Sequence, residues 1–351
     1  GIATNGQFYN YWDSSAVSYG SMPNGIANPK LTWETSEQLD FGLDMRFLND
    51  RLTVGLDYYI KTTKDLLVNA NAMPETGVSQ ITLNAGEVRN SGFEMELTWK
   101  DNIGDFNYSV SANLATLKNE VTYLDPSIDR IQGARVEGSS PESIYCYFEQ
   151  GQPVWYMRGY KYAGRAEDGS ALYYAADGTK TNNPQTDDMT NIGSGLPTLT
   201  YGLTLSGEYK GFDLTIFGTG AAGNDIYYGL YRTGWNNIAK GIYDDFKSKK
   251  LPDANTIAGD ATFWRSSGAV YDGSFFKIKQ IQLGYTLPKQ ITKKAFVENA
   301  RVYVSLDDFF TFTSYPGLDP ETTTQQFNCP GLDKGVYPNM SKVVLGVSVT
   351  F

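Results

Sequence analysis

The sequence predicts an all-β protein, a segment of a transmembrane antiparallel β-barrel with long extracellular loops. Three observations predict this fold class. Stretches of about ten residues alternate between apolar and polar side chains, as membrane strands do. Short and long connections follow one another in turn, and aromatic residues gather at the strand ends beside the short ones. No apolar run approaches the roughly 18–20 residues that a membrane-spanning helix needs.

Composition agrees with strands and argues against several functions. The chain has 351 residues, with 25 tyrosines, 18 phenylalanines and 36 glycines, types that suit strands, turns and aromatic girdles. The net charge of -10 disfavours a nucleic-acid partner, since phosphate binding needs clustered Lys and Arg. The absence of histidine removes the commonest general base and metal ligand. We therefore expect no enzymatic activity, no catalytic residue, no metal site and no cofactor.

Nine segments carry the alternation: residues 39–47, 52–61, 93–100, 106–114, 201–209, 212–216, 275–287, 301–312 and 343–351. In the first segment, odd positions are apolar and even positions are polar, so one face of the strand is apolar and the other is polar. The apolar face changes between Ile278 and Ile281, which predicts a β-bulge. The segments have about the length that crosses a bilayer when tilted.

The connections between these strands set the topology. Short connections fall at residues 47–51, 100–106 and 209–212, and long ones at 66–88, 117–200, 224–273 and 314–341. Barrels of the bacterial outer membrane have short periplasmic turns and long external loops. Aromatic residues mark the short-turn side as a periplasmic girdle: Phe47, Trp99, Phe106, Tyr209, Phe212, Tyr285 and Phe351. A soluble β-sandwich also alternates, but this asymmetry of its connections is not expected.

The alternation also predicts which side chains face lipid. Those expected on the lipid face are Leu43, Leu56, Leu97, Leu205 and Val347, and those expected in the lumen are Asp44, Asp57, Glu96, Ser206 and Ser348. A complete bacterial barrel has an even number of strands and both termini in the periplasm. With about nine strands and residues 1–33 outside, the chain cannot close by itself. We expect the strands at residues 34–47 and 341–351 to pair with strands outside this sequence.

Several short motifs, in order along the chain, resemble the SusC/RagA-type TonB-dependent transporters of Bacteroidetes. They begin with Asn28-Pro29-Lys30-Leu31-Thr32-Trp33-Glu34, Asp57-Tyr58-Tyr59 and Gly86-Glu87-Val88-Arg89-Asn90-Ser91-Gly92-Phe93-Glu94. They continue with Gly223-Asn224-Asp225-Ile226-Tyr227, Asp272-Gly273-Ser274-Phe275-Phe276-Lys277, Leu283-Gly284-Tyr285-Thr286-Leu287-Pro288 and Gly317-Leu318-Asp319-Pro320-Glu321. The resemblance implies that residues 1–351 are the C-terminal part of a 22-stranded barrel in the bacterial outer membrane. The plug domain and the TonB-contacting segment of the family are expected outside this chain.

The resemblance further implies a function and partners. Such transporters import oligosaccharides or peptides with energy delivered by TonB, under a SusD-like surface lipoprotein that serves as a lid. We expect the same here, with a glycan ahead of a peptide, and with outer-membrane lipid around the barrel. The acidic balance disfavours polyanionic cargo. The alternative function is that of a surface glycan-binding β-domain without transport.

Four aromatic residues in the long loops are the candidate substrate-binding residues: Trp155, Tyr156, Trp235 and Trp264. Flat aromatic faces stack on sugar rings or pack against a lid protein. The same residues would also serve if they only packed the loops together. The sequence leaves both roles open.

The sequence supports two other kinds of site less well, a glycosidase site and a calcium loop. A glycosidase needs two carboxylates, for which Glu142 or Asp307 with Asp308 could be nominated, but adjacent strand residues point to opposite faces. Family members often carry a calcium loop, whereas residues 177–183 lack the alternating oxygen ligands it needs.

Cys146 and Cys329 have no metal-type spacing, and we expect two separate thiols. Because both lie on the external side, a disulfide is the alternative.

Overall fold

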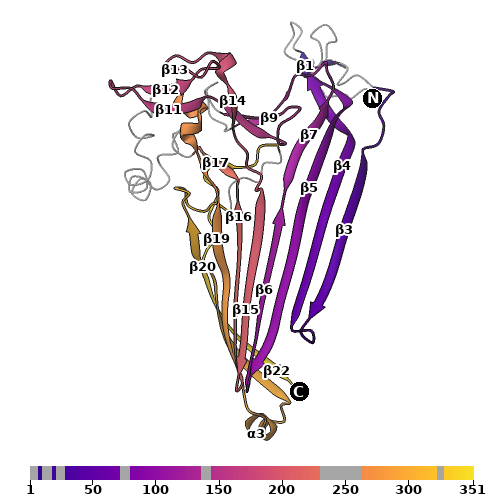
Figure 1. Cartoon of the computed structure of the whole chain (residues 1–351), viewed down its shortest axis with the longest axis vertical. Coiled ribbons are helices and arrows are strands. Elements are labelled where there is room, and N and C mark those ends of the chain that lie inside the picture. Colours follow the sequence, from indigo (N-terminus) through magenta and orange to yellow (C-terminus); the bar gives the residue numbers. More distant parts are fainter. Residues whose placement is uncertain are drawn as a thin grey trace.

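The computed structural model describes residues 7–9, 18–20, 28–71, 80–135, 144–229, 262–321 and 328–351. Its long strands form one antiparallel sheet in the order β22-β20-β19-β16-β15-β6-β5-β4-β3, which runs from the loops to a narrow lower end (Figure 1). The bounds are β3 (Thr35–Phe47), β4 (Leu52–Asn71), β5 (Gln80–Ile103), β6 (Phe106–Thr116), β15 (Leu199–Tyr209), β16 (Phe212–Ala222), β19 (Phe275–Thr286), β20 (Asn299–Thr313) and β22 (Lys342–Thr350). These nine strands are the nine that the alternation predicts. β7 (Lys118–Leu124) follows β6 directly and also pairs with β5.

The register places the predicted lipid and lumen residues on opposite faces. Leu43 lies opposite Leu56, and Leu56 lies opposite Met95. Leu205 lies between Val110 and Ile216, and Val347 lies opposite Val302. Because strand neighbours share a face, these apolar side chains form one continuous surface across the sheet. Asp44, Asp57, Glu96, Ser206 and Ser348 occupy the alternate positions, so the predicted division into two faces is confirmed.

The predicted bulge lies in β19. The partners of β19 skip Lys279, since Phe217 and Asp307 pair with Gln280 whereas Gly218 and Phe310 pair with Ile278. Asp308, in the facing part of β20, has a positive φ of 57°. The bulge turns Lys279 toward Asp308, 3.1 Å away. It therefore positions an ion pair described below.

One connection differs from its prediction. Residues 66–88 were expected to form a long loop, but β4 reaches Asn71 and β5 begins at Gln80, so most of the segment is strand. The prediction was wrong because Asp65 has a φ of 56° and the register shifts between Thr63 and Leu67, which breaks the alternation. On the short-turn side, residues 287–298 form a longer connection with α3 (Lys289–Thr292) and η6 (Lys293–Ala295), seen at the lower tip in Figure 1.

Glycine in β16 allows an aromatic ladder on the apolar face. The Tyr201 ring stacks on Phe276 with centroids 6.0 Å apart, and Tyr201 Oη donates a hydrogen bond to the Phe275 carbonyl (3.1 Å). Both contacts pass over Gly220, where a Cβ would lie 2.5 Å from the Tyr201 ring and from the Phe275 oxygen. Only glycine leaves this space open.

The external loop domain, which we define as the described residues of 117–198, 223–274 and 314–341, contains three small sheets. The first has β8 (Ile131–Arg135), β9 (Tyr145–Phe148), β10 (Tyr156–Gly159) and β14 (Thr190–Gly193); the second has β11 (Lys161–Arg165), β12 (Ala171–Tyr174) and β13 (Lys180–Thr181); the third has β17 (Asp225–Tyr228), β18 (Val270–Asp272) and β21 (Leu332–Asp333). Short 3₁₀ turns are η2 (Thr186–Asp188), η4 (Phe263–Arg265) and η5 (Ser267–Ala269). Outside this domain, β1 (Gln7–Tyr9) pairs with β2 (Ser18–Gly20).

The hydrophobic core of the described chain lies in the loop domain, not between the faces of the sheet. Its fully buried members come from all three connections and include Met157, Tyr227 and Leu332. β17 and β21 pair in parallel, which joins the second connection to the third. None of the described helices is long and apolar enough to cross a membrane.

The two cysteines form a disulfide, which corrects the expectation of separate thiols. Cys146 on β9 and Cys329 before β21 have Cα atoms 5.3 Å apart, although 183 residues separate them in sequence. The first and third connections pack into one core, and this packing brings the two side chains together. Spacing along the sequence contains no trace of that arrangement.

Candidate functional site: the polar face of the sheet and the external loops

The polar face of the sheet carries an acidic wall on β3, β4 and β5, formed by Asp40, Asp44, Asp57, Glu94 and Glu96. The register places them on one face: Asp57 pairs with Gly42 and Glu94, and Glu96 pairs with Gly55. All five side chains are exposed, and within the described part of the chain none of the five forms an ion pair. The wall repels anions and attracts cationic or hydrogen-bonding groups.

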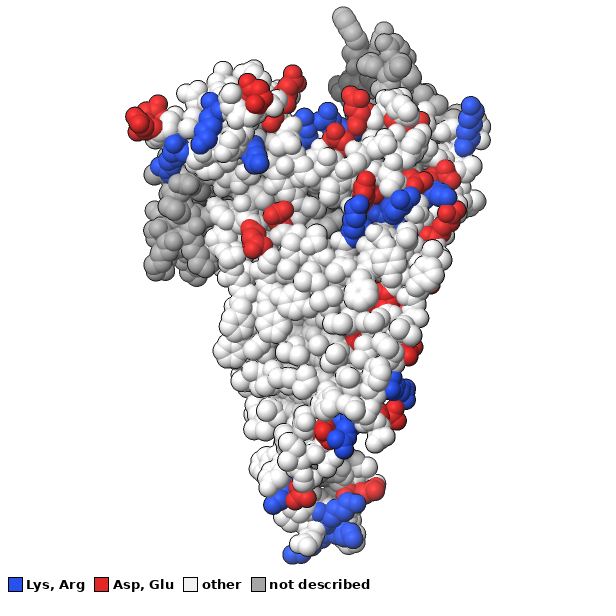
Figure 2. Space-filling model, viewed as in Figure 1, with Lys and Arg blue, Asp and Glu red and all other residues white. Residues whose placement is uncertain are grey.

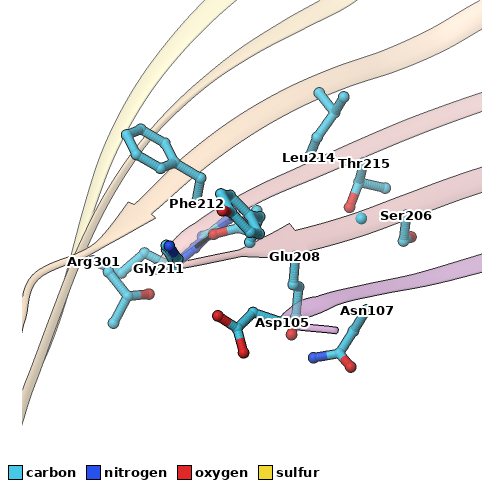
Figure 3. Close-up of a pocket in the computed structure, with 14 residues that line it drawn as sticks. Asp105, Asn107, Ser206, Glu208, Gly211, Phe212, Leu214, Thr215 and Arg301 are labelled. Atoms are coloured by element: carbon cyan, nitrogen blue, oxygen red, sulfur yellow. Dashed lines mark hydrogen bonds and ion pairs between the residues drawn. The ribbon is translucent and has the colours of Figure 1, made fainter. Parts of the chain in front are cut away.

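The lower end of the polar face is hollowed by a pocket of about 500 Å³ at the turn between β15 and β16. Figure 3 shows Asp105, Asn107 and Glu208 on one side of the strands and Phe212 and Leu214 on the other. Arg301 on β20 closes the pocket with a two-point ion pair, since its Nε lies 2.9 Å from Asp213 Oδ2 and its Nη2 contacts Oδ1. The pocket holds charge of both signs and no group with nucleophile geometry.

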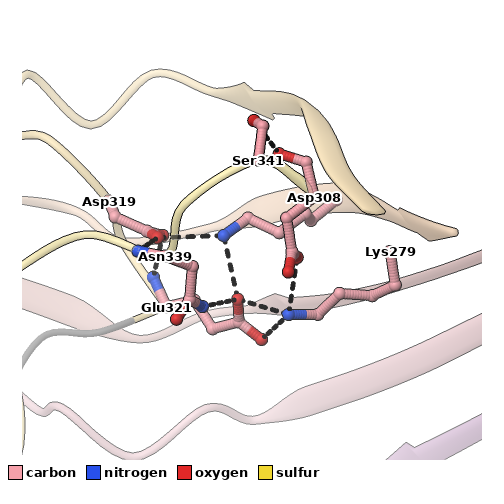
Figure 4. A network of polar contacts seen from close by, with 7 residues as sticks. Lys279, Asp308, Asp319, Glu321, Asn339 and Ser341 are labelled. Carbon is pink, nitrogen blue, oxygen red and sulfur yellow. Dashed lines mark hydrogen bonds and ion pairs between the residues drawn. The ribbon is translucent and has the colours of Figure 1, made fainter. Parts of the chain in front are cut away.

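The upper end of the polar face carries the lysine clasp, defined as Lys277, Lys279, Asp308, Asp319 and Glu321 (Figure 4). Lys277 Nζ lies 2.9 Å from Asp319 Oδ2 and 2.9 Å from Glu321 Oε2, and the Lys277 side chain is 2% exposed. Lys279 Nζ lies 2.7 Å from the Glu321 carboxylate and 3.1 Å from Asp308. The clasp joins β19 to the third external connection.

Two carboxylates of the clasp also accept hydrogen bonds from Asn339, which follows Glu321 in the sequence. The Asn339 backbone N–H donates to Asp319 Oδ2 (3.1 Å), and Asn339 Nδ2 donates to Glu321 Oε2 (2.9 Å). Burial opposes ionisation of Glu321, but the two lysines outweigh it and lower the pKa of this carboxyl. Two cations therefore face three carboxylates in a fixed arrangement.

The predicted substrate-binding aromatics do not form one exposed surface. Tyr156 and Trp264 are 2% and 3% exposed and lie in the core of the loop domain. Tyr156 Oη donates to Glu149, and burial together with that bond raises the pKa of Tyr156 well above its ordinary value. Trp155 is half-buried against Phe148, with ring centroids 5.6 Å apart. Trp235 lies outside the described residues, as does Glu142.

These positions favour loop packing over stacking on a ligand for Tyr156 and Trp264. Trp155 alone among the three described residues keeps part of its ring accessible. Its backbone has a φ of 56°, a conformation rarely adopted by large side chains. Asp307 and Asp308, the nominated glycosidase pair, have separate partners, Ser305 and Lys279.

Comparison with known proteins identifies a family with this architecture. The family of TonB dependent receptor-like β-barrels matches residues 2–300. The chain belongs to this family. TonB-dependent receptors of this kind are outer-membrane proteins, so the apolar face of the sheet is the lipid face and the polar face lines the lumen.

Relatives place this TonB-dependent receptor segment more narrowly. It is similar to TonB-dependent receptor P3 of Formosa agariphila, with 30% identity over 95% of this chain and 36% of the relative. It is 27% identical to TonB-dependent receptor SusC of Bacteroides thetaiotaomicron over 92% of this chain and 32% of SusC. A solved structure of the RagAB peptide transporter matches 99% of this chain with a TM-score of 0.76 and 25% identity.

The matches confirm the resemblance to SusC and RagA that the motifs indicate. The chain spans about a third of the length of the curated relatives it matches, and 39% of the matched RagAB chain. The activity and partners of a whole transporter are therefore taken up as proposals.

Sequence reasoning missed two features of the site. The first is the disulfide, which the spacing of Cys146 and Cys329 along the sequence does not indicate. The lysine clasp could have been suspected, because Lys277 and Lys279 follow an aromatic pair in a strand expected in the membrane, where unpaired cations are rare. Their partners, Asp319 and Glu321, lie in a motif used only to recognise the family.

Proposed function

We propose that this chain is the C-terminal barrel segment of a SusC-like transporter that imports oligomeric nutrients with energy delivered through TonB. The observation that carries the proposal is the continuous polar face of nine strands beneath a single packed loop domain. A lumen wall closed above by folded loops suits a gated path for a solute larger than a monosaccharide. The likeness to SusC and to the RagAB structure supports the same function.

The cargo that fits best is a neutral oligosaccharide, with a peptide as the second candidate. The five carboxylates of the acidic wall form no ion pair within the described chain, so a polyanion entering the lumen would be repelled. The peptide is favoured by one observation, the 25% identity to a transporter described as a peptide transporter. Both cargoes present the hydrogen-bonding groups that a polar wall can bind.

The partners of the proposed transporter are a SusD-like surface lipoprotein and TonB. The lipoprotein would dock on the external loop domain as a lid. TonB would act through a segment outside this chain. The plug of the transporter would likewise be supplied by that part of the full-length protein.

Trp155 is the residue of this segment that we assign to cargo contact, because its side chain is only partly buried in the loop domain. Pro153 and Gln152, its near neighbours, line a pocket of about 500 Å³ with Lys118, Asn119 and Glu120. The pocket lies where β6 passes into the loop domain. A sugar or peptide there would meet hydrogen-bonding side chains, and Trp155 follows the lining residue Pro153 by two positions in the sequence.

The test is uptake by cells that produce the full-length transporter. Fluorescent neutral oligosaccharides and peptides are supplied with and without a protonophore, and a strain lacking the gene is the control. We expect uptake of one cargo class, its loss with the protonophore, and its absence from the deletion strain. Uptake that persists in the protonophore, or cargo that stays on the cell surface, would favour the glycan-binding domain without transport.

A matched pair of variants tests the assignment of Trp155. Trp155→Ala should raise the cargo concentration needed for half-maximal uptake by roughly tenfold, since an aromatic stack contributes on the order of 1–1.5 kcal/mol. Trp33→Ala removes an indole that is 91% exposed at the external side and should leave uptake unchanged. Equal effects of the two substitutions would remove Trp155 from the site.

A further inference from the structure

The connection between β19 and β20, residues 287–298, has a charge opposite to that of the chain. It contains Lys289, Lys293 and Lys294 and one acid, Glu298, so its net charge is 3 − 1 = +2, whereas the whole chain has -10. The three lysines are exposed, and within the described residues none of them has an ion-pair partner. Figure 2 shows blue side chains, with a few red ones, at the lower tip, below a broad uncharged area in the left and centre of the view. We call residues 287–298 the periplasmic turn.

An exposed phenylalanine stands at the end of this turn. Phe296 caps η6 with a φ of 57°, and its side chain is 93% exposed. This left-handed position favours Gly or Asn, and a large side chain there is strained. Neither backbone preference nor packing within the chain explains a phenylalanine at this place. Strain combined with exposure is a feature of binding surfaces.

Backbone hydrogen bonds hold the turn against the strand ends, so its position relative to the end of the sheet is fixed. Leu287 N–H donates to the Ala300 carbonyl (2.9 Å), and Glu298 N–H donates to the Thr350 carbonyl (2.8 Å). Inside the turn, Val297 N–H donates to the Thr292 carbonyl (3.1 Å), and Thr292 is buried. The turn therefore projects as an ordered unit from the end of the barrel wall.

The turn is continuous with the aromatic girdle of the lipid face. Tyr285, at the end of β19, packs on Phe212 with ring centroids 4.5 Å apart. Thr286 N–H donates to the Gly211 carbonyl (2.7 Å), which joins the turn to the neighbouring hairpin. In that hairpin Lys210 is exposed, and its Nζ lies 5.1 Å from the Tyr209 ring. Lysines and aromatic rings thus alternate along one rim.

We propose that the periplasmic turn binds an anionic phospholipid of the inner leaflet of the outer membrane. The ammonium groups of Lys289, Lys293 and Lys294 contact the lipid phosphate, and Phe296 enters the interface between headgroups and acyl chains. Aromatic rings at this level and lysines just beyond it are the arrangement that membrane interfaces favour. Clustered lysines beside a bilayer attract anionic headgroups. The unpaired positive charge selects an anionic lipid over a zwitterionic one.

The alternative occupant is an acidic segment of a periplasmic protein. Such a segment would contact the same lysines. It would not account for the aromatic residues beside them, which are Tyr209, Phe212 and Tyr285. The continuity of the turn with the girdle favours the lipid. The experiment below separates the two occupants.

The test measures lipid retained by the purified full-length transporter in native mass spectrometry. Detergent-solubilised protein is mixed with equal amounts of phosphatidylglycerol and phosphatidylethanolamine. The wild type should retain phosphatidylglycerol in preference. The triple variant K289Q/K293Q/K294Q should lose that preference by on the order of tenfold. The control, K161Q/R165Q/K180Q, removes three positive charges from β11 and β13 in the loop domain and should retain the preference.

A second variant addresses the aromatic contact. Phe296→Ser should lower retention of both lipids while leaving their ratio near that of the wild type. Thr292 is buried, whereas Lys289, Lys293, Lys294 and Phe296 are exposed. Both variants should therefore keep the heat-dependent gel mobility of a folded barrel. Equal lipid retention by the wild type and the triple variant would overturn the proposal. So would capture of an acidic periplasmic protein that the triple variant loses while its lipid retention stays unchanged.

Discussion

Substitution of Lys277 by Met should release the third external connection from the barrel wall. The Lys277 side chain is 2% exposed and neutralises Asp319, whose side chain is 5% exposed, and Glu321. Lys277→Met preserves most of the side-chain volume but leaves those carboxylates with Lys279 as the only nearby cation of the clasp. Removal of one partner from a buried ion pair costs roughly 3–5 kcal/mol. We expect a local loss of stability of that size, concentrated in residues 314–321 and 328–341.

Hydrogen exchange of the full-length protein in detergent measures this loss directly. The amides of Glu321 and Asn339 donate to Asp319, at 3.1 Å each, and should exchange at least about a hundredfold faster in the variant. Amides in the middle of β15 and β16 should be unaffected. Lys279→Met is the matched control, because Lys279 is 22% exposed and solvent screens its ion pairs. Its effect should be clearly smaller.

A compensating variant isolates charge from packing. In Lys277→Met with Asp319→Asn and Glu321→Gln, no buried carboxylate lacks a cation. Protection should therefore return at one of the two amides, whereas the other stays unprotected because the substituted side chain has a single acceptor oxygen. The reasoning fails if Lys277→Met exchanges no faster than Lys279→Met. It also fails if the variant with all three substitutions exchanges as fast as Lys277→Met alone at both amides, since lost packing would then be the cause.

Two further predictions concern the loop domain. Replacing Cys146 and Cys329 together by Ser should lower its stability by at most about 5 kcal/mol, the chain-entropy value for a loop of 183 residues, because the pairing of β17 with β21 still ties the third connection to the loop domain. Limited proteolysis that cuts the loops no faster in the variant would contradict this. Burial raises the pKa of Asp333, whose carboxylate accepts hydrogen bonds from Tyr315 and Gly335. A raised pKa in the folded state stabilises the domain at low pH, and this contribution is lost as the pH rises from about 4, the unfolded value, through the folded value. Asp333→Asn should remove that part of the pH dependence in thermal unfolding, and an unchanged pH profile would count against the assignment.

The sequence predicts the sheet well because membrane strands obey a simple periodic rule. One face must be apolar along every strand, so Leu43, Leu205 and Val347 can be placed without any knowledge of the fold. The rule fails where the backbone leaves the regular pleat. The positive φ of Asp65 interrupts the alternation, so the sequence pattern does not reveal the extensions of β4 and β5.

The loop domain was beyond prediction for a different reason. Its core unites residues from three connections with no common period, and an isolated aromatic gives no sign of its orientation. Tyr156 and Trp264 could have been binding residues or core residues, and the structure places them in the core. The disulfide depends on the same packing.

The parallel pairing of β17 with β21 has a consequence for assembly. β21 lies about a hundred residues after its partner, and Cys329 lies 183 residues after Cys146. The outer cap is thus a structure of high contact order, which cannot form until the last hairpin of the chain has reached its place. Until then Ile226, Tyr227 and Leu332 lack their packing partners, and an incomplete cap exposes apolar surface. Completion of the C-terminal strands is therefore the event that lets the outside of the protein fold.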